Sequence, residues 1–372
     1  MKRNIVMLGH KRIPSREGGV EIVVEQLSTR MAALGHTVTC YNRGGHHVSG
    51  ARFDGEIPQN LRGVDLKTVW TLDKKGLAAV TSSFCGAVLA ALSKADVVHF
   101  HAEGPAFMCW LPRLFGKKVV VTVHGLDWQR EKWKNGFGAK YIRMGEQMAV
   151  RFAHEIIVLS RNVQDYFRDT YGRETHWIPN GVNMPEIVPA REIRSKWGLE
   201  QKEYLLFLGR LVPEKGVHDL ITAFRQVKTD KKLVIAGGAS DTDAYARRLQ
   251  QLAAGDDRII FTGFVQGREL EELYSNAYVY ALPSYVEGMP LSLLEAMSYG
   301  NCCLTSDIPE CTEVVEDKAL RFPKGDGDAL GQMLQRLCDE PETVAAYREQ
   351  ARPFICGKYS WDDVTNRTME LY

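Results

Sequence analysis

The chain has 372 residues, of which 45% are hydrophobic and 25% charged, and its formal net charge is +1. This length fits about two domains of ordinary globular composition, and the near-zero charge gives no electrostatic argument for a nucleic-acid partner. The eight cysteines form no Cys-x-x-Cys pair, which indicates thiols in a reducing, cytoplasmic compartment instead of a disulfide or zinc framework. The uncharged segment 76–93 is too short to span a bilayer, so we expect a buried helix there.

Short apolar runs alternate with helical stretches along the first half of the chain. A helix is predicted over 20–34, ending at Gly35. Strands are predicted over 5–8, 38–41, 66–69, 97–100, 119–123 and 156–159. Their continuous apolar character is typical of parallel strands buried on both faces, and it predicts a doubly wound domain over 1–183.

The second half repeats this alternation after a proline-rich stretch, 184–189, that is interpreted as a linker. Strands are predicted over 204–208, 233–236, 259–262, 279–282, 302–304 and 320–322. The tail 358–372 is predicted to be a helix with Ser360 as its N-cap. The fold class is therefore α/β, with two doubly wound Rossmann-like domains.

The stretch 284–300 carries the most specific pattern of polar residues. The turn 287–290 precedes a predicted helix with Pro290 at its first position, and the unpaired N–H groups of such a helix start can hold a phosphate. Glu295 follows Glu287 by eight residues, too far for the two carboxylates to share a proton or a metal. We expect them to hold two parts of one extended ligand; the alternative is two solvated charges.

Basic residues follow the strand 204–208, at the edge where α/β sheets bind ligands. Arg210 offers a planar fork and Lys215 a point charge, which suits a diphosphate. The Asp-x-Asp motif at 241–243 is predicted to begin a helix instead of lying in a strand-end loop. We therefore expect cationic side chains and the helix start to stabilise a leaving diphosphate without a metal or another cofactor.

Glu-x7-Glu with Gly-Met-Pro between the glutamates resembles the donor site of retaining GT-B glycosyltransferases of family 4 (group 1). The resemblance covers essentially the whole chain. It implies an acceptor-binding domain over 1–183, to which the helix 358–372 returns, and a nucleotide-sugar-binding domain over 184–357, facing each other across a cleft.

The resemblance also implies roles for individual residues of the second domain. Glu287 contacts the donor sugar, Glu295 the ribose, and Arg210 and Lys215 the pyrophosphate. The backbone of four further residues meets sugar and phosphate: Gly288, Met289, Pro290 and Leu291. The segment with Phe264 and Val265 is expected to meet the base.

In the first domain, the loop after the first strand lacks the Gly-x-Gly-x-x-Gly motif, so a nicotinamide site is disfavoured. By resemblance, Gly18 and Gly19 approach the donor phosphate, with a plain turn as the alternative, and His124 reaches the reacting carbon of the sugar. The segment 12–21 is similar to bacterial capsule, exopolysaccharide, O-antigen and rhamnosyl-type transferases, and its basic character suits an acceptor with phosphate. Candidate acceptor contacts are Arg16, Glu103 and Asn180.

These observations predict a retaining, metal-independent hexosyltransferase in which His124, Glu287, Arg210 and Lys215 are catalytic. It would move a hexose from a UDP-, dTDP- or GDP-linked donor to a glycan or lipid-linked acceptor of a bacterial surface polysaccharide. A nucleotide-sugar 2-epimerase and a non-catalytic nucleotide-sugar-binding scaffold remain alternatives. The basic and aromatic segments 110–118 and 128–144 either rest on an anionic membrane surface, at the inner face of the cell membrane, or pack on their own domain.

Overall fold

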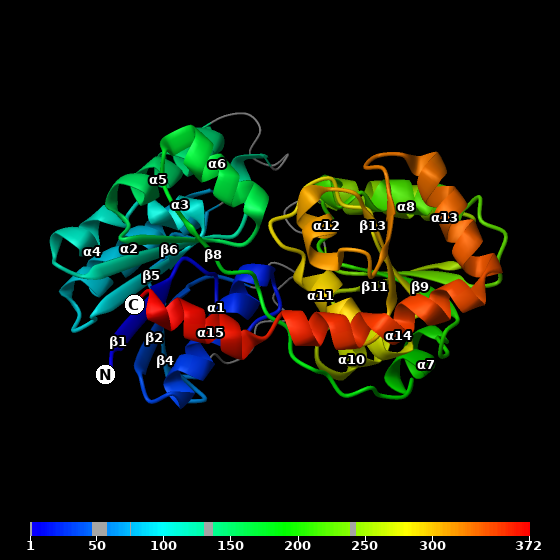
Figure 1. Ribbon diagram of the computed structural model, residues 1–372, viewed down its shortest axis with the longest axis horizontal. Helices are drawn as coiled ribbons and strands as arrows, with labels where there is room; N and C mark the ends of the chain where they lie inside the picture. The colour runs from blue at the N-terminus through cyan, green and yellow to red at the C-terminus, as the bar shows by residue number, and fades with distance from the viewer. Residues whose placement is uncertain (1, 47–57, 75, 130–136, 239–242) are drawn as a thin grey trace. The chain divides into compact units, whose positions relative to one another are not determined.

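The computed structural model describes residues 2–46, 58–74, 76–129, 137–238 and 243–372 (Figure 1). Its contacts divide the chain into two compact units. Unit 1 contains residues 1–181 and 361–372, and unit 2 contains residues 182–360. Each unit has its own largely parallel sheet covered by helices, so the predicted α/β class is confirmed.

The sheet of unit 1 has the strand order β3-β4-β2-β1-β5-β6-β7-β8, and every pair except β3 with β4 is parallel. The strands are β1 (Asn4–Leu8), β2 (Thr37–Arg43), β3 (Asn60–Leu61), β4 (Val64–Val69), β5 (Val97–His101), β6 (Lys118–Val123), β7 (Glu155–Val158) and β8 (His176–Trp177). Strands β3 and β8 were not predicted, because a strand of two residues has no apolar run to reveal it.

Helices of unit 1 follow most of these strands. They are α1 (Gly19–Ala33), α2 (Leu77–Leu92), α3 (Glu103–Ala106), α4 (Trp110–Leu114), α5 (Phe137–Phe152), α6 (Arg161–Tyr171) and α15 (Trp361–Glu370), with the 3-10 turn η2 (Asp127–Gln129). Figure 1 shows α15, in red, beside α1. Arg30 of α1 donates from Nε to Oδ1 of Asp362 at 2.8 Å, so the last helix completes unit 1.

One helix of unit 1 differs from its prediction. A buried helix was predicted over 76–93, but four large apolar side chains of α2 are 47–70% exposed. A helix that is apolar all round has no polar face to mark the side that meets solvent, so its sequence cannot show which face packs on the sheet.

The sheet of unit 2 has the order β11-β10-β9-β12-β13-β14, with all pairs parallel. Its strands are β9 (Tyr204–Leu208), β10 (Lys232–Ala236), β11 (Ile259–Gly263), β12 (Val279–Leu282), β13 (Cys302–Ser306) and β14 (Leu320–Phe322). Its helices are α7 (Glu192–Trp197), α8 (Val217–Phe224), α9 (Asp243–Ala253), α10 (Gly267–Asn276), α11 (Leu291–Ser298), α12 (Pro309–Val315), α13 (Gly327–Asp339) and α14 (Pro341–Lys358), with the turn η4 (Pro213–Lys215).

The proline-rich stretch 184–189, interpreted as a linker from its sequence, is attached to unit 2. Val188 is 4% exposed, its amide donates to the Ser275 hydroxyl at 3.1 Å, and its carbonyl oxygen accepts from Asn276 at 3.0 Å. These contacts with the end of α10 make the stretch part of the folded unit.

Candidate functional site

The strand order of unit 2 reverses direction between β9 and β12. β9 pairs in parallel with β10 on one side and β12 on the other, so the carboxyl ends of β9 and β12 lie next to each other at a topological switch point. Arg210 and Lys215 follow β9, and Glu287 follows β12. The topology therefore brings the two predicted polar segments to one edge of the sheet.

The turn after β9 fits tightly against the end of β12. Gly216 ends η4 with φ +65°, and a Cβ atom there would lie 2.1 Å from the carbonyl oxygen of Pro283. Only glycine tolerates both the left-handed backbone and this close approach. In addition, the Tyr285 amide donates to the carbonyl oxygen of Glu214 at 2.8 Å. These contacts fix the position from which the lysine of the turn extends.

Lys215 and Glu287 form an ion pair at this edge, 72 residues apart in the chain. The distance from Nζ to Oε1 is 2.5 Å, and the two side chains are only 14% and 9% exposed. The Ser284 hydroxyl donates to the same carboxylate oxygen at 2.6 Å. A cation and a carboxylate held with little solvent can bind a ligand that offers both negative charge and hydroxyl groups.

The helix α11 begins beside this pair. Pro290 is its N-cap, with φ −77° and ψ 95°. The prediction placed Pro290 at the first helical position, so the helix begins one residue later than predicted, at Leu291. The Pro290 carbonyl oxygen accepts from the amides of Leu293 and Leu294 at 3.0 and 3.2 Å. Because proline has no side-chain acceptor, it cannot cap the first N–H groups of α11 itself, and these can bind a negatively charged group. Met289 and Leu291 are both buried, at 8% exposure, and fix the turn on either side.

Glu295 lies in the second turn of α11 and is half-buried. Its Oε2 atom accepts from the Tyr274 hydroxyl of α10 at 3.1 Å, while the Tyr280 hydroxyl donates to Ser292 Oγ at 2.8 Å. The two carboxylates of the Glu-x7-Glu pattern therefore have different partners: Glu287 faces a lysine, and Glu295 faces a tyrosine. Tyr274 was not predicted as a site residue, and nothing in its local sequence distinguishes it.

Arg210 is half-buried at the end of β9. Here a Cβ atom at Gly237, which has φ +152°, would lie 1.8 Å from the carbonyl oxygen of Gly209, so the ends of β9 and β10 approach closely. Beyond β11, Val265 is buried and Phe264 half-buried. Their contact with a nucleotide base stays a prediction.

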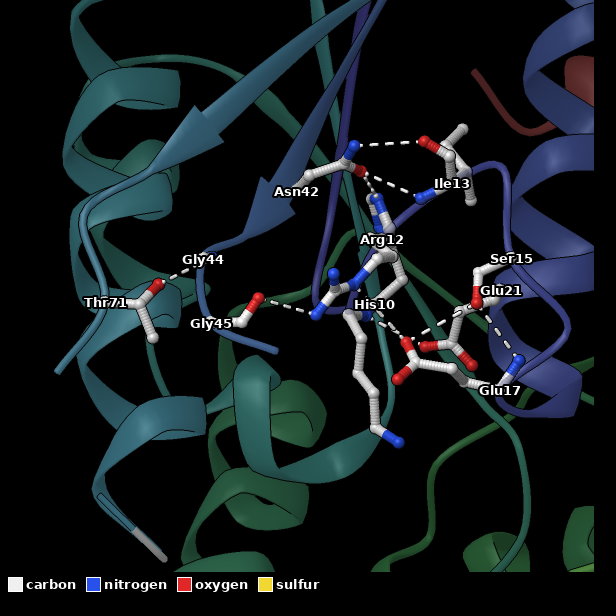
Figure 2. Close-up of polar contacts among 11 residues, drawn as sticks. His10, Arg12, Ile13, Ser15, Glu17, Glu21, Asn42, Gly44, Gly45 and Thr71 are labelled. Atoms are coloured by element: carbon white, nitrogen blue, oxygen red, sulfur yellow. Dashed lines mark hydrogen bonds and ion pairs between the residues drawn. The ribbon is translucent and has the colours of Figure 1, made fainter. Parts of the chain in front are cut away.

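In unit 1, the loop after β1 is held by its own polar contacts (Figure 2). His10 Nε2 lies 2.9 Å from Asn42 Oδ1, the Arg12 guanidinium pairs with Glu17 at 3.5 Å, and Glu21 Oε1 accepts from the amide of residue 11 at 2.8 Å. All five side chains are buried. The loop was predicted to be basic, but Glu17 pairs with Arg12 and the buried Glu21 carboxylate contacts the backbone of residue 11, so the two carboxylates reduce the net positive charge there.

The glycine pair stands at the start of α1. Gly18 is the N-cap in extended conformation and Gly19 is the first helical residue. A Cβ atom at Gly18 would lie 2.8 Å from Glu21 Oε2, so a side chain would displace that carboxylate. Nearby, Arg16 is exposed. The structure describes the turn; a contact of the two glycines with phosphate stays a prediction.

A column of histidines connects β5, β6 and the C-terminus. His124 Nε2 lies 3.1 Å from His101 Nδ1, and the His101 ring stacks on His99 with centroids 4.2 Å apart. His99 in turn contacts Thr122 Oγ1 at 2.7 Å and the Tyr372 hydroxyl at 2.5 Å. Burial lowers the pKa of His99 to about 3 and holds that of His101 well below its ordinary value. His124 thus ends a column whose other rings, His101 and His99, are uncharged. The alternation of His99 and His101 along β5 was the feature of the sequence from which this column could have been predicted.

Glu103 is wholly buried below the loop that carries His124. Its Oε2 atom accepts from the Asp127 amide at 2.8 Å, and the pKa of Glu103 is raised well above its ordinary value by burial first and then by Asp127 and Glu146. Glu146 accepts from Trp128 Nε1 at 3.2 Å and from the Tyr166 hydroxyl at 2.8 Å. Glu103 and Glu146 therefore hold the loop from inside the unit. An acceptor contact of Glu103 stays a prediction, as does one of Asn180, which is 3% exposed.

Within the described ranges, no group of three or more His, Cys, Asp or Glu residues is arranged to hold a metal ion. Residues 241–242 of the Asp-x-Asp motif, and 130–136 of the basic aromatic segment, lie outside these ranges. All eight cysteines are free thiols. A search of the described helices for one long and apolar enough to cross a membrane finds none.

Comparison with known proteins gives the class of this site. Residues 189–354 match the family model "Glycosyl transferases group 1", and residues 17–185 match "Glycosyltransferase Family 4". The Anabaena protein Alr3699/HepE, solved with UDP and glucose, superposes with a TM-score of 0.81 at 16% identity, covering 99% of this chain and 98% of that one.

Two curated relatives illustrate the range of the family. Alpha-maltose-1-phosphate synthase of Mycolicibacterium smegmatis is 26% identical over 306 residues, 75% of this chain and 79% of that protein. The O-antigen chain mannosyltransferase RfbU of Salmonella typhimurium is 26% identical over 255 residues, 67% of each chain. The fold and the site define a glycosyltransferase of GT-B architecture. More narrowly, each half of the chain matches one glycosyltransferase model, family 4 at the N-terminal side and group 1 at the C-terminal side.

Proposed function

We propose that this protein is a retaining glycosyltransferase that needs no metal and moves a hexose from a nucleotide-diphosphate sugar to a glycan or lipid-linked acceptor. The observation that carries the proposal is the Lys215–Glu287 ion pair at the β9/β12 switch point, beside the start of α11. This arrangement brings positive charge, a carboxylate and backbone N–H groups together at one sheet edge.

A nucleotide-diphosphate sugar presents matching groups in a row. Lys215 and Arg210 would bind the diphosphate, and the N–H groups of α11 would add dipole stabilisation of its charge. Glu287 would accept from hydroxyls of the sugar, and Glu295 from those of the ribose. UDP and glucose bound to Alr3699/HepE, a protein of the same fold, support a donor of this class.

The reaction requires stabilisation of a leaving group. The bond between the anomeric carbon and the diphosphate oxygen breaks, and the acceptor hydroxyl forms a new bond to that carbon on the same face. The acceptor proton passes to the departing phosphate oxygen. Lys215 and Arg210 would stabilise the growing negative charge, and His124, next to the uncharged His101, would contact the sugar near the reacting carbon.

Surface polysaccharide synthesis in bacteria is the proposed context. The similarity to an O-antigen mannosyltransferase supports it, as does the segment 12–21, which is similar to capsule and rhamnosyl-type transferases. The free cysteines fit a reducing, cytoplasmic compartment.

The test is to incubate the full chain with UDP-, dTDP- and GDP-hexoses in EDTA and to measure release of nucleoside diphosphate. Release with one donor, lost in Glu287→Gln and kept in the exposed control Glu342→Gln, would support the proposal. The anomeric configuration of a transferred sugar, read by NMR, tests retention. A free 2-epimer would instead identify an epimerase, and no release above background with any donor would favour a scaffold.

A further inference from the structure

The helix α2 carries no charged residue along its whole length, yet it does not bury all of its apolar side chains. Leu77, Phe84 and Leu92 are 47%, 50% and 70% exposed, and Leu89 is 47% exposed. At about 100° per residue, the first three share one side of the helix. On the other side, Ala87 and Ala90 are fully buried and the helix packs on the sheet. The exposed side is therefore a fixed apolar surface.

The end of α4 extends this surface. The helices α2 and α4 contact each other within unit 1 (Figure 1), and Leu114 and Phe115 at the end of α4 are 69% and 54% exposed. We define the α2–α4 patch as the exposed side chains Leu77, Phe84, Leu89, Leu92, Leu114 and Phe115. Six large apolar side chains on two adjoining helices are more than the scattered single ones that an ordinary soluble surface carries.

Cations gather at the end of the patch where α2 and α4 finish. Lys94 and Arg113 are exposed, and Lys117 donates to the carbonyl oxygen of Ser93 at 2.7 Å, directly after α2. The acidic residue here, Asp96, accepts from both the amide and the side chain of Asn4. The edge of the patch therefore presents positive charge beside apolar side chains.

We propose that the α2–α4 patch docks unit 1 on the surface of a bilayer that contains anionic lipids. The apolar side chains would enter the boundary between headgroups and acyl chains, and the lysine and arginine side chains would extend to the headgroup phosphates. A second copy of the chain fits less well, because a two-fold contact centred on this end would set Lys94 and Arg113 against their own copies. Docking does not depend on the donor chemistry proposed above.

This surface shares the segment 110–118 with the one that the sequence indicated, but not the described residues of the segment 128–144. In the basic aromatic segment, Trp128 is half-buried with its indole N–H bonded to Glu146, the Arg143 guanidinium lies 4.4 Å from the Trp128 ring centroid, and Ile142 is buried. These described residues pack on unit 1. Lys140 and Met144 of this segment stay exposed, but the larger exposed apolar surface is that of α2 and α4.

The test is sedimentation of the full chain with vesicles of phosphatidylcholine alone or mixed with phosphatidylglycerol. The wild type should bind the mixed vesicles and bind the neutral ones much more weakly. Leu92→Ser with Phe115→Ser should lower the vesicle affinity at least tenfold, and Lys94→Glu with Arg113→Glu should lower it by about fivefold or more per charge. The control is Leu34→Ser, whose side chain is 58% exposed at the end of α1 and which should bind as the wild type does.

Melting temperature and stabilisation by UDP are measured on every variant, so that loss of folding or of donor binding is recognised separately. The proposal is overturned if wild type fails to sediment with anionic vesicles, or if the control loses binding as strongly as the patch variants. It is also overturned if light scattering finds a dimer that the patch variants abolish, because the patch would then bind a second copy.

Discussion

The Lys215–Glu287 ion pair can be measured as a coupling energy. The two side chains are 14% and 9% exposed and their charged atoms lie 2.5 Å apart, so each neutralises the other where little water reaches. Lys215→Met and Glu287→Gln each remove one charge, and the double variant removes both. Comparison of the four proteins isolates the interaction of the pair from the other effects of each substitution.

Removal of one partner from a buried pair costs about 3–5 kcal/mol. The cost here should be smaller, about 2 kcal/mol, because the Ser284 hydroxyl still donates to Glu287 at 2.6 Å and both side chains keep some solvent contact. The double variant should lose about as much as one single variant, so the coupling energy should also be about 2 kcal/mol. For a folded unit of this size, 2 kcal/mol corresponds to a fall in Tm of about 4–8 °C.

Differential scanning calorimetry of the four proteins gives the stability terms, and titration with UDP gives the affinities. Both single variants should also bind UDP at least tenfold more weakly if Lys215 contacts the diphosphate directly and Glu287 fixes its position. Losses of stability that simply add in the double variant would refute the pairing. An unchanged UDP affinity in Lys215→Met would refute its role in donor binding.

Three further predictions test other parts of the structure. Gly216→Ala should destabilise unit 2 by several kcal/mol, since its Cβ would lie 2.1 Å from a carbonyl oxygen. The control Gly172→Ala, at φ +61° with nothing within 4 Å, should cost only about 1–2 kcal/mol. Equal losses of stability in urea unfolding would contradict the close approach at Gly216. Burial, followed by neighbouring carboxylates, raises the pKa of Glu103 above its ordinary 4.5. The free energy of unfolding should therefore fall as the pH rises through and above 4.5. In urea titrations at several pH values, Glu103→Gln should make the free energy of unfolding depend less on pH, and an unchanged dependence would count against the buried proton. Tyr372→Phe leaves His99 Nδ1 buried without its hydroxyl partner and should cost about 1–3 kcal/mol; a Tm equal to that of the wild type would exclude this bond.

Most strands of the two sheets could be predicted, because a strand that is buried on both faces is a short apolar run in the sequence. Examples are β9 (Tyr204–Leu208) and residues 119–123 of β6. The two-residue strands β3 and β8 have no such run and were missed. The burial of α2 was predicted wrongly for the opposite reason, because a helix without polar residues does not mark its solvent side. Periodicity thus predicts the elements but not the faces that they cover.

The candidate site was predictable in its residue types and not in its pairings. Lys215 and Glu287 were both identified from local patterns, but their contact depends on β9 lying next to β12, which no local signal reveals. In the same way, the cations of the β1 loop were visible in the sequence, while the pairing of Glu17 with Arg12 and the contact of Glu21 with the loop backbone were not. Contacts between segments follow from strand order, and strand order is a property of the whole unit.

We expect unit 2 to bind a nucleotide diphosphate through Lys215, Arg210 and Glu295 without a metal. The most direct test of this binding is the melting temperature of the full chain with UDP, dTDP or GDP in EDTA, for wild type and Glu295→Ala, because a ligand that binds only the folded state stabilises it according to its occupancy. We expect one of the three to raise the Tm of the wild type in EDTA, and Glu295→Ala to reduce this rise. A Tm that none of them changes, or that changes only when a divalent cation replaces EDTA, would exclude metal-free binding at this site.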